Sequence, residues 1–318
     1  MAALLAEHYG ASGMAVLAID SGPSSMAWKV TAVGGESFCL KDHKLRPLDR
    51  VRREHEFMHA LRSEGFTFAP EVIPTRATTG DIIAEFRGRS YSLYRWIDSD
   101  PAFVWTVGGW TSKQAQAAGM VLGAFHKTAA TVGATREASL DEQNQRFCDS
   151  RPHLNDTRSW AVPILQRASG LFPSDVIIHL SNFDDLLRSA SIAASDERTH
   201  GIIHGDFHPG NVLFRASTAV GVLDFEYCRY DSRWFDVAYA TMSFSFESMD
   251  PAYALAFLDG YAETFERLRI DQLQPLVRLS AWLSAIWLIE QCQKGAAAHD
   301  EVLPALRKCM AILSASLD

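Results

Sequence analysis

Short hydrophobic runs dominate the N-terminal part of the chain and predict strands. They are rich in β-branched and aromatic residues, and pairs of them flank glycine turns at Gly34-Gly35 and Gly88. The predicted strands are residues 16–19, 26–33, 37–41, 82–86 and 90–95. Residues 2–8 predict a short helix, and residues 48–63 place apolar side chains at helical spacing. A small sheet with few helices is therefore expected here.

Helical periodicity takes over beyond Thr111. Helices are predicted at 112–131, within 172–195, and at 231–245, 251–268, 270–294 and 302–317, whereas 133–160 is polar and predicts a loop. Three strands interrupt this pattern, at 202–204, 212–215 and 220–224. The sequence thus predicts an α+β protein of two lobes. Its expected division is 1–97 and 98–318, with a hinge near 94–99.

Charge and composition narrow the partners. The chain has 318 residues, 47% of them hydrophobic, and a net charge of −8. No basic surplus offsets the phosphates of a nucleic acid, so no nucleic-acid partner is expected. The longest apolar stretch, 279–289, is shorter than a membrane span and no signal-peptide pattern precedes it. Five scattered cysteines without a C-x-x-C pair favour a reduced, cytoplasmic protein.

The most specific pattern is His204-Gly-Asp206-Phe-His-Pro-Gly-Asn211, followed after a hydrophobic strand by Asp224-Phe-Glu226. The spacing matches the template for phosphoryl transfer. Asp206 is predicted to orient or deprotonate an attacking hydroxyl. Asn211 and Asp224 are predicted to hold Mg²⁺ against the phosphates, because amide and carboxylate oxygens suit this hard cation.

A second chemistry is open to the same residues. Alternating His204, Asp206 and His208 on a strand could bind zinc in a metallohydrolase. That interpretation gives Asn211 and Asp224 no role, so the phosphoryl-transfer interpretation is favoured.

Residues 202–240 resemble the aminoglycoside phosphotransferase and choline kinase superfamily. H-G-D-x-H-P-G-N is similar to the aminoglycoside phosphotransferase form, and D-F-E-Y and F-D-V-A resemble choline and ethanolamine kinases. Homoserine kinase-like members are similar in the helical tail. The resemblance implies a protein kinase-like fold and a small-molecule kinase that uses ATP and Mg²⁺. A catalytically silent nucleotide-binding module of the same fold is the alternative; the intact Lys41, Asp206, Asn211 and Asp224 set speaks against it.

Nucleotide-binding residues are expected in the N-terminal lobe. The resemblance implies that the loop with Gly22, Ser24 and Ser25 covers the phosphates. Lys41 ends an apolar strand and is predicted to contact the α- and β-phosphates while a helix glutamate holds it. Glu54 fits that glutamate better than Glu56. Lys44, in the following loop, is the weaker competitor of Lys41.

The adenine is expected at the hinge, against backbone groups of Leu93, Arg95 and Trp96. In the other lobe, His204 is expected to brace the catalytic loop, and the family pattern implies that Asp236 anchors it from the next helix. His208 and Glu226 are supporting candidates whose roles stay open between ligand contact and structure.

The acceptor is expected to be a small molecule that carries a hydroxyl and, by preference, an amine. The −8 charge, the aromatic-rich tail and the D-F-E-Y resemblance all favour a cation. Aminoglycosides, choline-like alcohols and homoserine-like compounds are the classes considered. Possible acidic partners for the amine are Glu247, Asp250 and Glu290.

Overall fold

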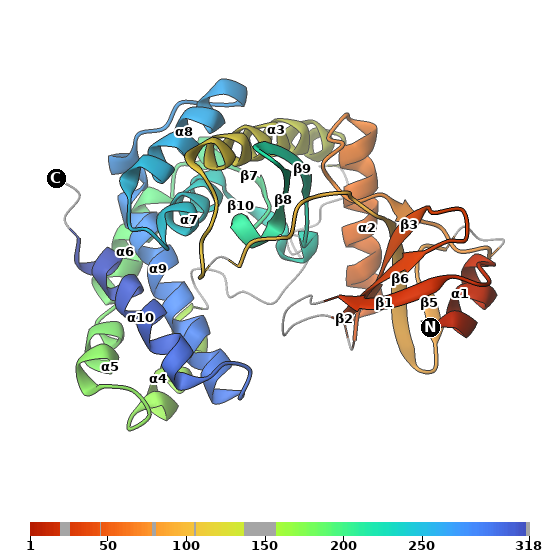
Figure 1. The fold of residues 1–318 in the computed structure, drawn as a ribbon. Coiled ribbons are helices and arrows are strands. Elements are labelled where there is room, and N and C mark those ends of the chain that lie inside the picture. The colour runs from red at the N-terminus through yellow and green to blue at the C-terminus, as the bar shows by residue number, and fades with distance from the viewer. Residues whose placement is uncertain (20–25, 45, 78–80, 105, 137–156, 316–318) are drawn as a thin grey trace.

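The computed structural model describes residues 1–19, 26–44, 46–77, 81–104, 106–136 and 157–315. Gly22, Ser24 and Ser25, predicted as phosphate-loop residues, lie outside these ranges, so their role stays a prediction. A sheet-rich N-terminal part is followed by a mainly helical C-terminal part, which confirms the α+β class (Figure 1).

The N-terminal sheet is antiparallel, with strand order β1-β2-β3-β6-β4 and β5 paired to β6. Its strands are β1 (Ala15–Ile19), β2 (Met26–Thr31), β3 (Ser37–Asp42), β4 (Val72–Ile73), β5 (Ala84–Phe86) and β6 (Arg89–Arg95). Helix α1 (Ala2–Tyr9) packs Leu4 and Leu5 against the sheet residues Val30, Leu40 and Leu93. Burial alternates along β3, so Leu40 enters this core while Lys41 faces the other side.

Helix α2 (Leu48–Ser63) belongs to a different core. Its buried Phe57, Met58 and Leu61 join the large hydrophobic cluster of the C-terminal part. The Phe57 ring lies edge-on to Phe125 of α3 (Ser112–Arg136), with centroids 6.3 Å apart. Helix α2 therefore lies at the junction of the two parts, as Figure 1 shows.

Helix α3 runs against α8 (Pro251–Thr264) at close range. A Cβ atom added to Gly119 would lie 2.0 Å from the Phe257 carbonyl oxygen, and one added to Gly260 would lie 2.0 Å from the Gln116 oxygen. Only glycine permits this backbone approach at both positions.

Helices α4 to α10 and four strands complete the C-terminal part. The helices are α4 (Thr157–Ala168), α5 (Ser174–Ser181), α6 (Asp184–Ala193), α7 (Arg233–Ser245), α8, α9 (Ile270–Gln293) and α10 (His299–Ser314). The strands form two antiparallel pairs: β7 (His200–Ile203) with β10 (Arg229–Ser232), and β8 (Val212–Arg215) with β9 (Thr218–Val222). No helix in the described ranges is long and apolar enough to cross a bilayer.

The structure corrects three predictions of secondary structure. The predicted loop at 133–160 gives way to α4 from Thr157 onward, and the single helix within 172–195 is two helices, α5 and α6. The helix predicted from residue 231 begins only at Arg233, because residues 229–232 form strand β10. This strand reads Arg-Tyr-Asp-Ser without apolar alternation and is formed by backbone pairing with β7.

Candidate active site

The catalytic loop turns sharply where β7 ends. Gly205 has φ +77°, and a Cβ atom there would lie 2.4 Å from the Tyr227 carbonyl oxygen, so the loop requires glycine at this position. The short 3₁₀ turn Pro209–Asn211 follows, and its first free N–H, that of Gly210, donates to His208 Nδ1 over 3.0 Å. The loop therefore folds back on itself, as the Pro-Gly pair predicts.

Asp206 and Asn211 meet inside this loop. Asn211 Nδ2 donates to the Asp206 backbone oxygen over 2.8 Å and to its Oδ2 over 3.2 Å. Because the amide nitrogen is used in this way, Oδ1 of Asn211 is the atom left to ligate a cation. His208 Nε2 lies 3.6 Å from Asp206 Oδ2, beyond a hydrogen bond.

His204 braces the loop. Its Nε2–H donates to the Leu223 carbonyl over 3.0 Å, and its Nδ1 accepts from the Asp206 N–H at 3.3 Å. This pattern assigns the neutral tautomer. Burial lowers the pKa of His204, which favours the same neutral state. His204 thus ties the loop of Asp206 to the strand end that carries Asp224.

Asp236, on α7, lies under the same loop. Its carboxylate accepts hydrogen bonds from the N–H groups of His204 (2.6 Å) and Gly205 (2.8 Å), the contacts expected of an anchor. Burial alone would raise the pKa of this carboxyl, but His126 and the backbone donors hold it below its ordinary value.

His126, on α3, joins this arrangement without having been predicted from the sequence pattern. Its Nε2 lies 3.1 Å from Asp236 Oδ2 and its Nδ1 lies 2.8 Å from the Tyr261 hydroxyl. The available signal was a single histidine within the apolar face of α3.

Asp224 lies just after β9 and faces the N-terminal part. Its backbone has φ 58° and ψ 64°, a left-handed conformation that aspartate tolerates better than most residues. Lys41 Nζ donates to Asp224 Oδ1 over 2.5 Å. Although burial opposes both charges, this pairing raises the pKa of Lys41 and lowers that of Asp224, so both groups are held ionised.

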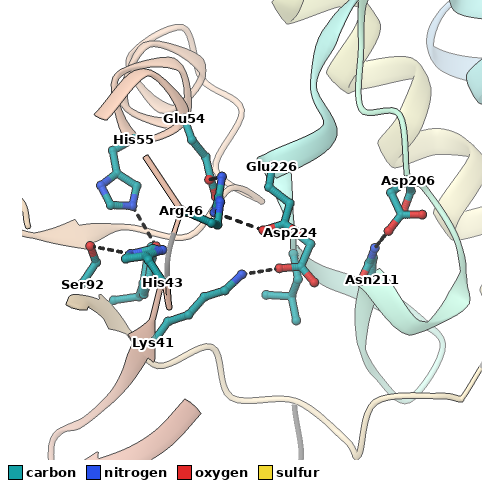
Figure 2. A network of polar contacts seen from close by, with 12 residues as sticks. Lys41, His43, Arg46, Glu54, His55, Ser92, Asp206, Asn211, Asp224 and Glu226 are labelled. Carbon is teal, nitrogen blue, oxygen red and sulfur yellow. Dashed lines mark hydrogen bonds and ion pairs between the residues drawn. The ribbon is translucent and has the colours of Figure 1, made fainter. Parts of the chain in front are cut away.

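The expected Lys41–Glu54 ion pair is not the one found. Arg46, in the loop between β3 and α2, donates from Nη2 to Glu54 Oε2 over 2.8 Å. Its Nη1 lies 3.1 Å from Glu226 Oε2 (Figure 2). Lys41 forms its ion pair with Asp224 instead. Glu56 is exposed and Lys44 lies in a loop with φ 53°, so neither competitor occupies the site.

Two buried histidines lie behind this network. His43 Nε2 is 2.9 Å from the Ser92 hydroxyl, and His55 Nε2 is 2.8 Å from that of Tyr94. The ring centroids of His43 and His55 are 5.6 Å apart. Burial is the main cause that lowers the pKa of His55 to about 4 and that of His43 to about 2. Both are therefore neutral at physiological pH.

The hinge differs from the prediction in one respect. The N–H of Arg95 donates to the Glu71 carbonyl and that of Trp96 to the Ser37 carbonyl. These two donors are occupied and do not point to an adenine. Leu93 is buried in β6 between β3 and β4, so its side chain belongs to the core of the sheet.

The acidic side chains considered as partners of an amine already have partners nearby. Glu247 contacts Lys308, Asp250 caps α8 through the Ala252 N–H, and Glu290 pairs with Lys294, so each has a local partner.

In the described ranges, no group of three or more His, Cys, Asp or Glu side chains is arranged to hold a metal. The zinc interpretation of His204, Asp206 and His208 is therefore not supported, since both His204 nitrogens are already bonded.

Solved structures with a similar fold cover almost the whole chain. A microcompartment-associated aminopropanol kinase matches at 20% identity with a TM-score of 0.69, over 98% of this chain and 94% of the other. An amicoumacin kinase, solved in complex with AMP-PNP, Ca²⁺ and Ami, matches at 17% identity with a TM-score of 0.66, over 94% of this chain and 87% of the other. At these identities the likeness establishes the fold, which is protein kinase-like as expected.

Sequence comparison identifies the family. A homoserine kinase of Zymomonas mobilis is 27% identical over 167 residues, which are 50% of this chain and 47% of that protein. The chain thus spans about half the length of this curated relative. The model of the phosphotransferase enzyme family matches residues 15–271. The catalytic loop, Lys41 and Asp224 all fall within that range, and the chain belongs to the phosphotransferase enzyme family.

Proposed function

We propose that this protein is an ATP- and Mg²⁺-dependent small-molecule kinase that phosphorylates a hydroxyl group of an amine-bearing acceptor. One observation carries the proposal: the Asp206–Asn211 pair and the Lys41–Asp224 pair, from three separate segments, converge on one site (Figure 2). A base, a neutral oxygen ligand, a charged oxygen ligand and a phosphate-binding cation are the four groups that phosphoryl transfer needs.

Residues 1–97 would bind the nucleotide and 98–318 would supply the catalytic loop and the acceptor pocket. Asp206 accepts the proton of the acceptor hydroxyl while the hydroxyl oxygen attacks the γ-phosphorus. The bond from that phosphorus to the bridging oxygen breaks, and ADP leaves. Lys41 contacts the phosphates once it is released from Asp224. His204 is not proposed as the base, because both of its ring nitrogens are already hydrogen-bonded.

Asn211 and Asp224 fit a magnesium ion. The free Oδ1 of Asn211 and the ionised carboxylate of Asp224 are hard oxygen ligands of the kind that Mg²⁺ prefers. When bound, the ion offsets phosphate charge.

The acceptor class rests on relatives and on charge. The homoserine kinase and aminopropanol kinase matches are both named for hydroxylated amines. The net charge of −8 also favours a cation. Since the candidate acids Glu247, Asp250 and Glu290 are locally paired, attraction by the general field of the acidic protein is the remaining support.

The test is ATP turnover over a panel of hydroxylated amines, homoserine and neutral sugars, with and without Mg²⁺. Mg²⁺-dependent ADP formation with at least one amine is expected. The KM for that amine should rise with ionic strength more than the KM for a neutral analogue, because salt screens the attraction between the amine and the acidic protein. Nucleotide binding without turnover on any acceptor would favour the silent-module alternative. Better turnover of neutral sugars would overturn the acceptor class alone.

A further inference from the structure

Arg46 joins the two parts of the chain through a single guanidinium. It contacts Glu54 on α2, in the N-terminal part, and Glu226 in the turn after Asp224, in the C-terminal part. The exposed fractions of the side chains are 3% for Glu54, 19% for Glu226 and 23% for Arg46. These charged groups are therefore largely shielded from water. Removing one of them would leave its partner as an unpaired buried charge, which is strongly destabilising.

The ion pairs of Lys41 and Arg46 involve these two cations and three carboxylates, those of Glu54, Asp224 and Glu226. Their formal sum is one negative charge. Without Arg46 it would be two, in a place where a polyphosphate must bind. Arg46 thus makes the neighbourhood more acceptable to an anion.

The two cations bind different carboxylates. Arg46 donates to Glu54, and Lys41 donates to Asp224. We propose, on the premise of the kinase function above, that Arg46 is a positioning residue that holds Glu54 and Glu226 together and so leaves Lys41 and Asp224 available to the nucleotide and its metal. The helix glutamate of this chain thereby acts on the arginine rather than on the lysine.

The chemistry of arginine suits this role. A planar guanidinium presents donors in a fixed fork and can bind two carboxylates at once, whereas the lysine ammonium is a point charge. When Lys41 transfers from Asp224 to the phosphates, Arg46 can keep Glu54 and Glu226 in place. The two acids then do not compete for Lys41.

The experiment compares Arg46→Gln with Arg52→Gln, a matched control. Arg52 is on the same helix as Glu54, is 45% exposed and pairs with Asp81 within the N-terminal part. Steady-state KM and kcat and the MgATP dissociation constant from thermal shift are measured for each. For Arg46→Gln we expect the KM and dissociation constant of MgATP to rise about tenfold, equal to ~1.4 kcal/mol. The control should match the parent, and Arg46→Lys should recover part of the loss.

Adding Glu226→Gln separates positioning from direct phosphate contact. If Arg46 acts by holding the acids, removing one acid reduces the need for it, so Arg46→Gln/Glu226→Gln should bind MgATP more tightly than Arg46→Gln alone. Equal or weaker binding by the double variant, or a normal dissociation constant in a folded Arg46→Gln, contradicts the inference. A parent that binds MgATP but phosphorylates no acceptor defeats the proposed function instead, and the dissociation constants still test Arg46. A parent with no MgATP affinity defeats both.

Discussion

Lys41 Nζ and Asp224 Oδ1 lie 2.5 Å apart although 183 residues separate them in the chain. Lys41 comes from β3 of the N-terminal sheet, and Asp224 from the turn after β9. The contact closes the site across the junction of the two parts and pairs the proposed phosphate-binding cation with the proposed metal ligand. Under the proposed function, the nucleotide phosphates and the metal would take the place of this ion pair.

Asp224→Asn is the sharpest test of the metal site. Asparagine tolerates the left-handed backbone at this position, so the change removes charge without adding the strain that alanine would bring. A ligand at 100 times its dissociation constant stabilises a protein by about 2.7 kcal/mol. We expect MgATP at that excess over the parent's constant to stabilise the parent by this amount and Asp224→Asn by much less. Asn211→Ala should fall between them in thermal-shift measurements. Equal MgATP stabilisation of all three would refute the site.

Asp206→Asn tests the base. The substitution keeps the shape of the side chain but removes the acceptor for the hydroxyl proton. A positioned base contributes about 10²–10⁴-fold to rate, so kcat should fall by that factor. The dissociation constant of MgATP should stay near that of the parent. Near-normal turnover in a folded variant would remove Asp206 from the mechanism.

Asp236→Ala should separate the scaffold from the chemistry. The change leaves the N–H groups of His204 and Gly205 and the ring of His126 without their acceptor. An unpaired buried group costs about 1–3 kcal/mol, so the free energy of unfolding and the turnover should both fall. Asp206→Asn serves as the comparison, since it should lower turnover with little change in melting temperature. Unchanged melting of Asp236→Ala would contradict the anchoring role.

The contact between Asp206 and Asn211 could be predicted because the two residues are close in the chain. Asp206 and Asn211 belong to one loop, and the 3₁₀ turn that brings them together is set by adjacent residues. The partner of Glu54 could not be predicted in the same way. Whether Arg46 or Lys41 reaches that glutamate depends on how the loop before α2 packs against Glu226, a contact between distant segments.

The same distinction holds for the fold. Helices α2 and α9 have the predicted bounds to within one residue. Strand β10 and the occupied hinge donors of Arg95 and Trp96 depend on backbone pairing with distant residues, which leaves no pattern in side-chain polarity.

Gly260→Ala tests the close packing of α3 and α8. Alanine favours a helix by about 1 kcal/mol over glycine, yet its Cβ would meet the Gln116 oxygen at 2.0 Å, so the backbones must move apart. Overpacking of this kind costs about 1–3 kcal/mol, and we expect a net loss of stability in denaturant unfolding. Gly133→Ala is the matched control on α3, because its Cβ would make an ordinary 3.6 Å contact with Ile202. It should be neutral or stabilising. A stable Gly260→Ala would contradict the observed helix spacing.

His55 predicts how stability depends on pH. Burial lowers the pKa of His55 from 6.5 to about 4 in the folded protein, so the unfolded chain binds a proton first as the pH falls. The contribution of His55 to stability is complete above about pH 6.5 and is lost progressively toward pH 4, at up to ~1.4 kcal/mol per pH unit. Between pH 7 and pH 5 this amounts to about 2 kcal/mol.

His55→Gln isolates that contribution, because the neutral amide can still accept a hydrogen bond from Tyr94 but does not titrate. The variant is expected to be less stable than the parent at pH 7, since the ring packing with His43 and Tyr94 is lost. Its stability should nevertheless fall by about 2 kcal/mol less than that of the parent between pH 7 and pH 5. Urea unfolding at both pH values measures this difference. Parallel pH profiles for the two proteins would show that His55 takes up its proton equally readily in the folded and unfolded states, contrary to its burial behind Lys41 and Arg46.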